Sequence, residues 1–562
     1  MGKGVTVAFT TIRRSVGRRL SPGQQLSVYK FRHGLHGYQR WWRSAWALVT
    51  PDRLIGTEAR DLSDILTSEQ ARDIVADTLA RRGVQIRLLP SPVADGPRIL
   101  AAAEDLPTLI SALSYLPNVH AWAVRIRRRG RAKWLAAPRA VLKIGEGAAV
   151  ISLRRTYELP TGKSTAFPGL GEVRIELWEA LHGGEERADG EPHLPGTRVP
   201  RSASATVPYL TAELWDSLPY GPVAGTPALS LPHLMAVTEP VDVVYTWVDG
   251  SDPAWAQRKR VVLGTEGAAD DVNASADSHS RFASHDELRY SLRSLEAYAP
   301  WVRHVYLVTD RQVPAWLVDN HPRLTVVDHS EIFTDPSVLP VFNSHAIESQ
   351  LHHIDGLSER YLYVNDDVFF GRSVSVELFF EANGIAKFYL SKATLDVGPA
   401  SARDLPVLSA AKRNADLIAQ TFGRSITRKF KHTPHTQSRR VLDEMEERFP
   451  EVFAQVASSR IRHPDDHSIA SALQHYYAYA MGHAIPGEIR YAYVNLSDAE
   501  AELALLRLLL GRNVDVFCLN DTFTDADGEE RAHALSAWFL EEYFPLPSSF
   551  ERPTPGGSVT GR

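Results

Sequence analysis

Two adjacent carboxylates, Asp366 and Asp367, follow directly after an apolar run in the segment YLYVNDDVFFG, residues 361–371. Burial of an unpaired carboxylate costs several kcal/mol, and two neighbouring carboxylates repel each other. The pair is therefore expected either where a buried strand reaches the surface or around a bound cation. Carboxylate oxygens suit Mg²⁺ or Mn²⁺, which can bridge to phosphate oxygens. The plainer alternative is a polar strand end at which Asp367 caps the next turn.

Five further short segments carry side chains able to bind phosphate, move a proton or contact a sugar. They are DGSDP (249–253), NSHAIE (343–348), KHTPH (431–435), RIRHPDDHS (460–468) and CLND (518–521). By itself the first would be only a turn, although Gly250 allows close backbone approach and Ser251 can donate to phosphate. In KHTPH, Pro434 prevents the helix on which a two-histidine zinc motif is built. Cys518 is most simply a small buried residue, because no base stands beside it in the sequence.

Alternating strand and helix patterns after residue 241 predict a parallel sheet, whereas KHTPH and CLND fall in non-helical breaks of the mostly helical region that follows. Four apolar runs predict strands that each end in a polar residue. The runs are Val243–Val248, Val305–Thr309, Leu324–Val327 and Tyr361–Val364, and the polar residues are Asp249, Asp310, Asp328 and Asp366. Between them, SHDELRYSLRSLEAYAP predicts a helix with its leucines on one face, and NSHAIESQLHHI predicts a shorter one. Such sheets bind ligands beyond the carboxyl ends of their strands, where Asp366 falls.

Composition divides the rest of the chain. Residues 57–182 alternate helix and strand patterns and predict a small α+β domain. Residues 183–240 are rich in Pro, Gly, Ser and Ala, which is typical of a linker. The α/β part is expected over residues 241–552, with a mostly helical insert at about 400–485, and a short tail at 553–562 is expected to be disordered.

Bulk properties exclude some classes of protein. The chain has 562 residues and a net charge of −5, so its overall electrostatics do not favour nucleic acid as a partner. The single cysteine allows no internal disulfide, and no apolar run is long enough to span a bilayer. Basic and aromatic side chains are interleaved in a leader, residues 1–56, in which no acid precedes Asp52. The leader is expected either to lie on an anionic membrane surface or to pack against the protein as a basic arm. The protein is expected in the cytoplasm, and the first alternative would place it at the inner face of the membrane.

Longer blocks around these segments resemble the Stealth family. In chain order they are DVVYTWVDGSDP, DELRYSLRSLEAYAPWVRHVYLVTD, LPVFNSHAIESQLHHIDGLSERYLYVNDDVFFG, KHTPH, and FCLNDT with YFPLPSSFE. The family comprises sugar-1-phosphate transferases that build bacterial capsular or cell-wall polysaccharides, and it includes the catalytic part of the eukaryotic GlcNAc-1-phosphotransferase. The resemblance implies an α/β fold similar to the GT-A type of nucleotide-sugar-binding fold, with a helical insert. Asp249 and His285 depart from the family pattern, which often has Asn at both positions, and the first departure puts the nucleotide contacts in doubt.

For the reaction, the resemblance implies that a glycan hydroxyl attacks the β-phosphorus of a UDP-sugar and that UMP leaves. Such a transfer needs a neutralised diphosphate, an in-line hydroxyl and a base for its proton. Asp366 and Asp367 would hold Mg²⁺ or Mn²⁺, His345 or His435 would be the base, and Arg462 and His463 would act at the reacting phosphate. Donor or acceptor contacts would come from Asp249, Gly250, Ser251, Asp252, Arg289, Asn343, Asn365, His432, Asp466, Asn520 and Asp521.

Alternatives stay open for the function and for single residues. A metal-dependent glycosyltransferase attacks the sugar carbon and releases UDP, and fold alone does not separate the two reactions. The third possibility is a non-catalytic carbohydrate-binding protein. The acids and histidines present at the motif positions argue against it. Arg289 would otherwise form an ion pair on its own helix, and Asp465 and Asp466 would serve as first-turn acids of a helix. The sugar, the acceptor and the oligomeric state are not determined by these patterns.

Overall fold

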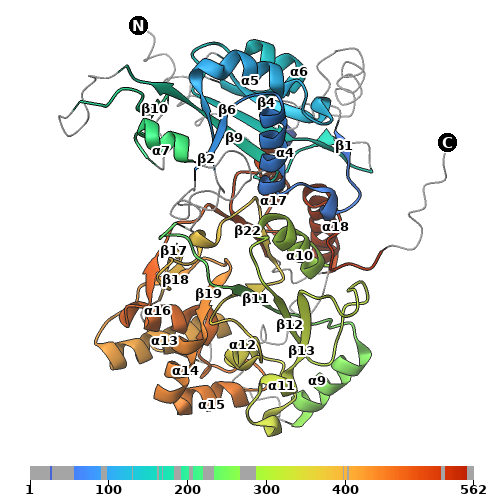
Figure 1. The fold of residues 1–562 in the computed structure, drawn as a ribbon. Helices are drawn as coiled ribbons and strands as arrows, with labels where there is room; N and C mark the ends of the chain where they lie inside the picture. The colour runs from blue at the N-terminus through green and yellow to red at the C-terminus, as the bar shows by residue number, and fades with distance from the viewer. Residues whose placement is uncertain are drawn as a thin grey trace, which may run out of the picture.

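The computed structural model describes residues 56–89, 98–128, 131–160, 164–167, 169–182, 192–201, 207–218, 233–265, 286–396, 398–401, 404–520 and 526–553, with residues 24, 26 and 27. Two α/β regions lie one above the other in Figure 1, a smaller one from the first part of the chain and a larger one from the rest. Almost all of the leader, and the tail after residue 553, lie outside the described residues, so both expectations stay predictions. Within the described residues, no helix has both the length and the apolar composition that a membrane crossing requires.

The small domain is a seven-stranded mixed sheet with helices packed on one face. The strand order is β2-β3-β9-β6-β4-β5, and a further strand, β10, pairs with β9. Helix α4 (Ser68–Arg81) begins at Thr67, whose side chain caps it, and buries Val75 and Leu79 against the sheet. Its partners follow in chain order: β2 (Ile86–Leu89), β3 (Arg98–Ala102), α5 (Leu106–Leu113), β4 (Trp122–Arg128), β5 (Arg131–Ala136), α6 (Ala137–Ala140), β6 (Val150–Arg155) and β9 (Glu172–Ala180).

Part of the segment predicted as a linker belongs to this small domain. Strand β10 (Arg198–Pro200) pairs antiparallel with β9, and helix α7 (Ala212–Ser217) packs on the second face of the sheet. There Trp215 lies against Trp178 with ring centroids 6.1 Å apart. Because successive strand residues point to opposite faces, Trp178 needs a cover that the helices of the first face do not provide. The linker prediction is therefore wrong for the described residues 192–201 and 207–218.

The large domain is built on the parallel sheet that the sequence predicts. Its order is β13-β12-β11-β14-β19, in which the first four strands are parallel and β19 (His435–Ser438) is an antiparallel edge. Three of the parallel strands, β11, β12 and β14, are buried apolar runs, as expected where a sheet is covered on both faces, whereas the edge strand β13 is partly exposed. The parallel strands are β11 (Val241–Thr246), β12 (Val305–Thr309), β13 (Leu324–Asp328) and β14 (Arg360–Asn365).

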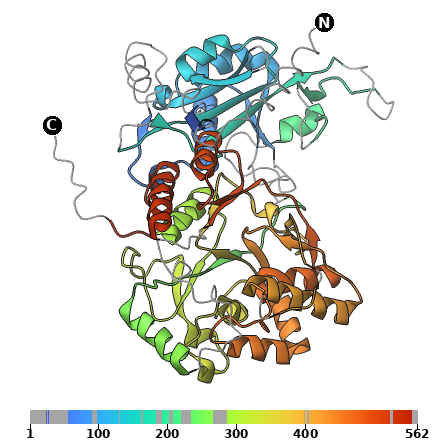
Figure 2. The ribbon, with the colours of Figure 1, turned by 180° about the vertical axis from the view of Figure 1, so that it is seen from behind.

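A second sheet of three strands lies next to the first and carries the chain after Asp367. Strand β15 (Val368–Phe370) pairs antiparallel with β22 (Val516–Asn520), which pairs parallel with β21 (Tyr491–Asn495). Val368 is therefore opposite Cys518, which brings the C-terminal block of the sequence to the two acids. Helix α10 packs against β15, and the helices α17 and α18 pack against each other between the two domains in Figures 1 and 2. Their bounds are α10 (Glu287–Tyr298), α17 (Ala501–Gly511) and α18 (Ala526–Tyr543).

The region expected as a helical insert, about 400–485, is mostly helical but also completes the main sheet through β19. It packs against the short helix α12 (Ser344–Glu348), which precedes β14 in the chain. The insert thus holds α12 from the side, and α12 carries the predicted site residue His345 and is capped by another, Asn343. The helices of the insert are α13 (Pro406–Phe422), α14 (Arg439–Arg448), α15 (Pro450–Ser458), the π-helix η10 (Ile469–Leu473) and α16 (Gln474–Ala480).

Candidate active site

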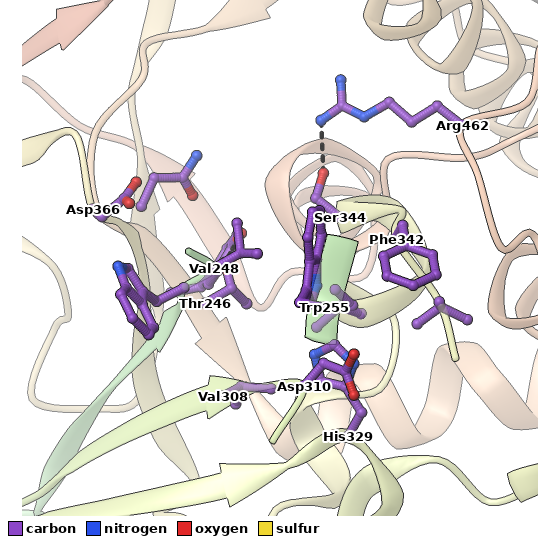
Figure 3. A pocket seen from close by; sticks show the side chains of 15 residues that line it. Thr246, Val248, Trp255, Val308, Asp310, His329, Phe342, Ser344, Asp366 and Arg462 are labelled. Carbon is purple, nitrogen blue, oxygen red and sulfur yellow. Dashed lines mark hydrogen bonds between the residues drawn. The ribbon is translucent and has the colours of Figure 1, made fainter. Parts of the chain in front are cut away.

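A cavity of about 210 Å³ lies at the carboxyl ends of β11, β12 and β14. Its wall includes Trp255 and Phe342, whose rings meet edge to face at 5.2 Å. In Figure 3 the carboxylate of Asp366 lies on one side and the guanidinium of Arg462 on the other. The pattern of polar residues after apolar strands therefore leads to a cavity, because parallel strands end at a common edge.

Asp366 follows the last residue of β14 and lines this cavity. Burial raises the pKa of its carboxyl group well above the usual range, and the negative charges of Glu287 and Asp367 add to the increase. Burial and these two neighbouring charges therefore both disfavour the ionised form of Asp366. A divalent cation or a bound proton is the normal compensation for such a group.

The side chain of Asp367 contacts the second sheet through Cys518 of β22. Its Oδ2 accepts a hydrogen bond from Cys518 Sγ at 3.3 Å and lies 3.6 Å from His432 Nδ1. His432 Nδ1 is also 3.2 Å from Cys518 Sγ, and its Nε2 is 2.9 Å from Asn365 Nδ2. The expectation that no base stands beside Cys518 is wrong in three dimensions, since β22 brings the cysteine to both groups. Burial raises the pKa of the Cys518 thiol well above its usual range, with Asp367 adding to the rise, so the sulfur stays protonated.

The residues present fit a divalent cation. Oδ1 of Asp367 and Oδ1 of Asn365 are buried and have no hydrogen-bond partner among the described atoms. Hard oxygen ligands of this kind are those that Mg²⁺ and Mn²⁺ prefer. Asp367, His432 and Cys518 also form a group whose ligand atoms all lie within 4.8 Å of one another. That group mixes oxygen, nitrogen and sulfur, a set better suited to a softer metal than to Mg²⁺.

His345 and Asn343 meet Asp466 behind the cavity wall. Asn343 caps α12 through the backbone N–H of His345 and donates from Nδ2 to Asp466 Oδ2 at 2.8 Å. Oδ2 of Asp466 also accepts from the backbone N–H of His463 at 2.9 Å and lies 3.6 Å from His345 Nδ1. Burial alone would raise the pKa of Asp466, but His345, the backbone N–H of His463 and Ser459 lower it overall, so the carboxylate is charged. Asn343 is fully buried and positions His345 and Asp466. The sequence predicted it as a substrate contact and did not predict this positioning role.

Arg462 is the only arginine or lysine that lines the cavity among the described residues. Its Nη2 donates to Ser344 Oγ at 2.7 Å, the bond drawn in Figure 3. Burial lowers the pKa of the guanidinium, while Glu348, Tyr363 and Asp466 act in the opposite direction. The group remains a cation, because the ordinary pKa of arginine is far above neutral pH.

His435 lies on β19 opposite Tyr363 and is buried. Its ring stacks on that of Tyr363, and its Nδ1 is 3.1 Å from His475 Nε2. Burial, together with the neighbouring His475 and His432, lowers the pKa of His435 well below its usual range. His435 is thus a neutral imidazole that supports Tyr363, a residue of the cavity wall.

The DGSDP turn is held together mainly by its own side chains and by Gln312. Asp249 Oδ1 accepts from the backbone N–H and the hydroxyl of Ser251, at 2.9 and 2.6 Å. Gln312 Nε2 donates to the carbonyl oxygen of Asp249 and to Asp252 Oδ2, at 2.9 and 3.0 Å. Asp252 also accepts from the backbone of Ala254 at the start of α9 (Pro253–Thr265). The turn, with Gly250 at its centre, follows Val248 of the cavity wall, so its place next to the cavity agrees with the nucleotide-contact prediction without testing it.

Two other predicted residues, Arg289 and His463, do not line this cavity. Arg289 donates to Glu551 Oε2 at 2.5 Å and lines another cavity between the domains, so it does not face Asp366. His463 is half exposed beside Asp465 and does not line the cavity. Asn520 ends β22, and Asp521 lies outside the described residues.

The sequence patterns did not predict the aromatic residues of the cavity wall, nor the residue that follows β12. Trp247, Trp255 and Phe342 look like core residues in the sequence, because an apolar side chain carries no local mark of facing a cavity. Asp310 was marked as the polar end of a strand but not as a site residue. It lines the wall, and its Oδ2 pairs with Arg258 at 2.8 Å.

Family models describe this chain in four successive blocks. Stealth protein conserved region 1 matches residues 239–266, region 2 residues 281–388, region 3 residues 431–479 and region 4 residues 507–556. The exopolysaccharide phosphotransferase SCO6023 of Streptomyces coelicolor is 44% identical over 425 residues, which are 74% of this chain and 70% of that protein. The chain belongs to the Stealth family.

Two further relatives carry the same description. Exopolysaccharide phosphotransferase SCO2594 of Streptomyces coelicolor is 47% identical over 365 residues, 64% of this chain and 59% of that protein. Exopolysaccharide phosphotransferase CpsY of Mycobacterium tuberculosis is 40% identical over 323 residues, 57% of this chain and 60% of that protein. This Stealth chain is accordingly a phosphotransferase, and it spans between 59% and 70% of the length of these three relatives.

A solved structure of the galactosyltransferase LgtC with donor and acceptor sugar analogs aligns at 12% identity and a TM-score of 0.28. The alignment covers 56% of this chain and 98% of LgtC. The sheet register explains how the four Stealth regions form one site. Strand β11 of region 1 pairs with β14 of region 2, β14 pairs with β19 of region 3, and β15 of region 2 pairs with β22 of region 4.

Proposed function

We propose that this phosphotransferase moves a hexose 1-phosphate, or an N-acetylhexosamine 1-phosphate, from a UDP-sugar to a hydroxyl of a glycan. A bond forms between the acceptor oxygen and the β-phosphorus, the bond from that phosphorus to UMP breaks, and the hydroxyl proton goes to a base. The observation that carries the proposal is the cavity with Arg462 on one side and Asp366 on the other. Its volume, below the roughly 300–1,000 Å³ of pockets that enclose whole ligands, corresponds to part of a nucleotide sugar.

Arg462 and Ser344 bind the phosphate oxygens in this proposal. The hydrogen bond between them orients the guanidinium before the donor arrives, and a guanidinium can bind a phosphate in two-point geometry. Negative charge that moves onto the leaving UMP is stabilised most by donors that are already in place.

His345 is the residue we assign as the base. Asp466 faces its Nδ1 at 3.6 Å, so the proton of the neutral ring is favoured on Nδ1 and Nε2 is left as the acceptor. The charged Asp466 also stabilises the imidazolium that forms, and hydrogen bonds of such pairs tighten when substrate binds. His435 suits this role less, because its Nδ1 is engaged with His475 and its pKa is low.

Mg²⁺ or Mn²⁺ is the cofactor we propose, held by Asp366 and Asp367. The ion would neutralise the diphosphate of the donor and the leaving UMP. Trp247 and Trp255 in the wall offer flat apolar faces to the uracil or the sugar. Asp249, Ser251 and Asp252 remain proposed contacts of the nucleotide, and Asn520 and Asp521 of the donor or acceptor.

The test is a turnover assay with a panel of UDP-sugars and a glycan acceptor. The released nucleotide is identified by chromatography, and the product is examined by phosphorus NMR for a phosphodiester. UMP together with a phosphodiester signal is the expected result. UDP release, with a new glycosidic bond and no phosphodiester signal, would overturn the proposal in favour of a glycosyltransferase. Arg462→Lys is the informative variant, because it keeps the charge but loses the two-point geometry, and we expect its rate to fall by about 10²-fold.

A further inference from the structure

A cluster of two histidines and a glutamate lies away from the Asp366 cavity. His352 and His353 are the last residues of the 3-10 helix η8 (Leu351–His353), and Glu446 is on α14. The Nε2 atoms of His352 and His353 both point to Oε2 of Glu446, at 2.8 and 2.9 Å. Asp443, one turn earlier on α14, has its Oδ1 4.0 Å from His352 Nε2. Three side chains that can bind a metal thus meet at one point, and the carboxylate of Asp443 is close to it.

The proton on His353 distinguishes this arrangement from an ordinary hydrogen-bond cluster. Its Nδ1 is 3.0 Å from the carbonyl oxygen of Ile332, and a carbonyl only accepts, so Nδ1 carries a proton. In the neutral ring, Nε2 then presents a lone pair toward the carboxylate of Glu446. Either a second proton or a metal ion must occupy that position. Histidines that bind metals typically donate their other ring N–H to a backbone carbonyl in this way.

The surroundings fix the backbone that carries the two histidines and leave a route for an ion. His352 is almost completely buried, whereas His353 and Glu446 are partly exposed and Asp443 is more than half exposed. Arg439 donates to the carbonyl oxygens of His352 and Leu357, at 3.1 and 3.0 Å, and fixes the backbone of η8 from behind. The nitrogen ligands are therefore positioned in advance, and the carboxylates lie on the side from which solvent has access.

We propose that His352, His353 and Glu446 form a structural Zn²⁺ site, with Asp443 or water as the fourth ligand. Zn²⁺ binds imidazole nitrogen and carboxylate oxygen at about 2.0–2.2 Å in tetrahedral geometry, which places its ligands roughly 3.3 Å apart. The two nitrogens need to move only about 0.5 Å away from Glu446 to reach that spacing, and Glu446 is exposed enough to turn. Two imidazoles favour Zn²⁺ over Mg²⁺, and two carboxylates would balance its charge.

The site would join two parts of the large domain. η8 follows α12, which carries Ser344 and His345 of the candidate active site, and α14 belongs to the helical region around it. A metal between η8 and α14 would fix the C-terminal side of α12. The expected effect is on stability and on the order of this segment, with no direct part in the transfer.

The experiment uses the full chain in a Cys518→Ser background, so that the Asp367–His432–Cys518 group does not compete for zinc. Metal is removed, Mg²⁺ is added in excess, and Zn²⁺ is titrated against a chromophoric chelator. The same samples are measured by thermal unfolding. One equivalent of Zn²⁺ with submicromolar affinity and a raised unfolding temperature is the expected result. The affinity should fall at least tenfold, and the thermal gain should disappear, in Glu446→Gln and in His353→Asn.

Glu447→Gln is the matched control, because it makes the same chemical change on the neighbouring residue of α14, whose side chain is exposed. It should bind Zn²⁺ as the parent does. Absence of zinc uptake by the parent would overturn the proposal and leave the cluster as a proton-bridged ion pair. Equal affinity of the parent and Glu446→Gln would overturn it as well.

Discussion

Asp466→Asn separates the support of a catalytic histidine from the stability of the fold. The side chain of Asp466 is completely buried, and its Oδ2 accepts hydrogen bonds from Asn343 and from the backbone of His463 while facing His345. The amide has nearly the same shape and can keep both hydrogen bonds through its oxygen. It removes only the charge, and the amide NH₂ takes the place of Oδ1, which has no partner among the described atoms.

The magnitudes follow from these contacts. A hydrogen bond to a charged group contributes about 1.5–3 kcal/mol, compared with about 0.5–1.5 kcal/mol for a neutral one, so two weakened bonds cost about 2 kcal/mol of unfolding free energy. The rate should fall far more, because the imidazolium of His345 loses its counter-charge. A general base contributes about 10²–10⁴-fold, and we expect the first-order rate of UMP release to fall by at least about 10²-fold.

Single-turnover UMP release and urea unfolding measure the two effects on the same preparation. Asp465→Asn is the matched control: it makes the same change one residue earlier, at a half-exposed carboxylate that pairs with Arg413. That control should retain full rate. A rate of Asp466→Asn within threefold of the parent would refute the assignment of His345 and Asp466. A loss of unfolding free energy well above 4 kcal/mol would show that Asp466 acts mainly through the fold.

Four further predictions test other parts of the structure. Asp366→Asn should abolish transfer but raise the thermal unfolding midpoint of the metal-free protein. The reason is that burial and the charges of Glu287 and Asp367 disfavour the ionised carboxylate of Asp366. A lower midpoint in calorimetry would contradict this prediction. Chelation by EDTA should stop turnover and Mg²⁺ or Mn²⁺ should restore it, whereas full activity of exhaustively chelated enzyme would reject the metal assignment. Burial opposes the charge of Glu551, but Arg293 and Arg289 lower the pKa of this carboxyl group overall. The charged carboxylate therefore stabilises the fold at any pH above 4.5, the ordinary pKa of glutamate, and this stabilisation is lost as the pH falls through the lower pKa of the folded state. Glu551→Gln should thus lose about 3–5 kcal/mol at pH 7 and show a flatter acid limb in denaturation from pH 7 to 3, and unchanged stability at pH 7 would count against this network. Trp215→Ala should destabilise the small domain by about 3–5 kcal/mol, measured by the near-ultraviolet circular dichroism of unfolding, if α7 is part of that domain.

The sequence by itself determined the parallel sheet and the edge at which the site lies. Strands β11, β12 and β14 are covered on both faces, so they appear in the sequence as continuous apolar runs that end where the chain becomes polar. Asp366 stands at such an end, and the structure places it in the cavity wall. These features depend on a residue and its immediate neighbours, which is why a local pattern is enough to predict them.

The tertiary structure alone decided which partner each polar side chain meets. Arg289 pairs with Glu551, 262 residues away, and Asp367 meets Cys518, 151 residues away. Trp215 covers the sheet of the small domain from a segment whose composition is typical of a linker. A charged or aromatic side chain takes the nearest partner that the fold supplies, and strand pairing and helix packing bring that partner from a distant part of the chain. Spacing within one segment therefore carries no information about it.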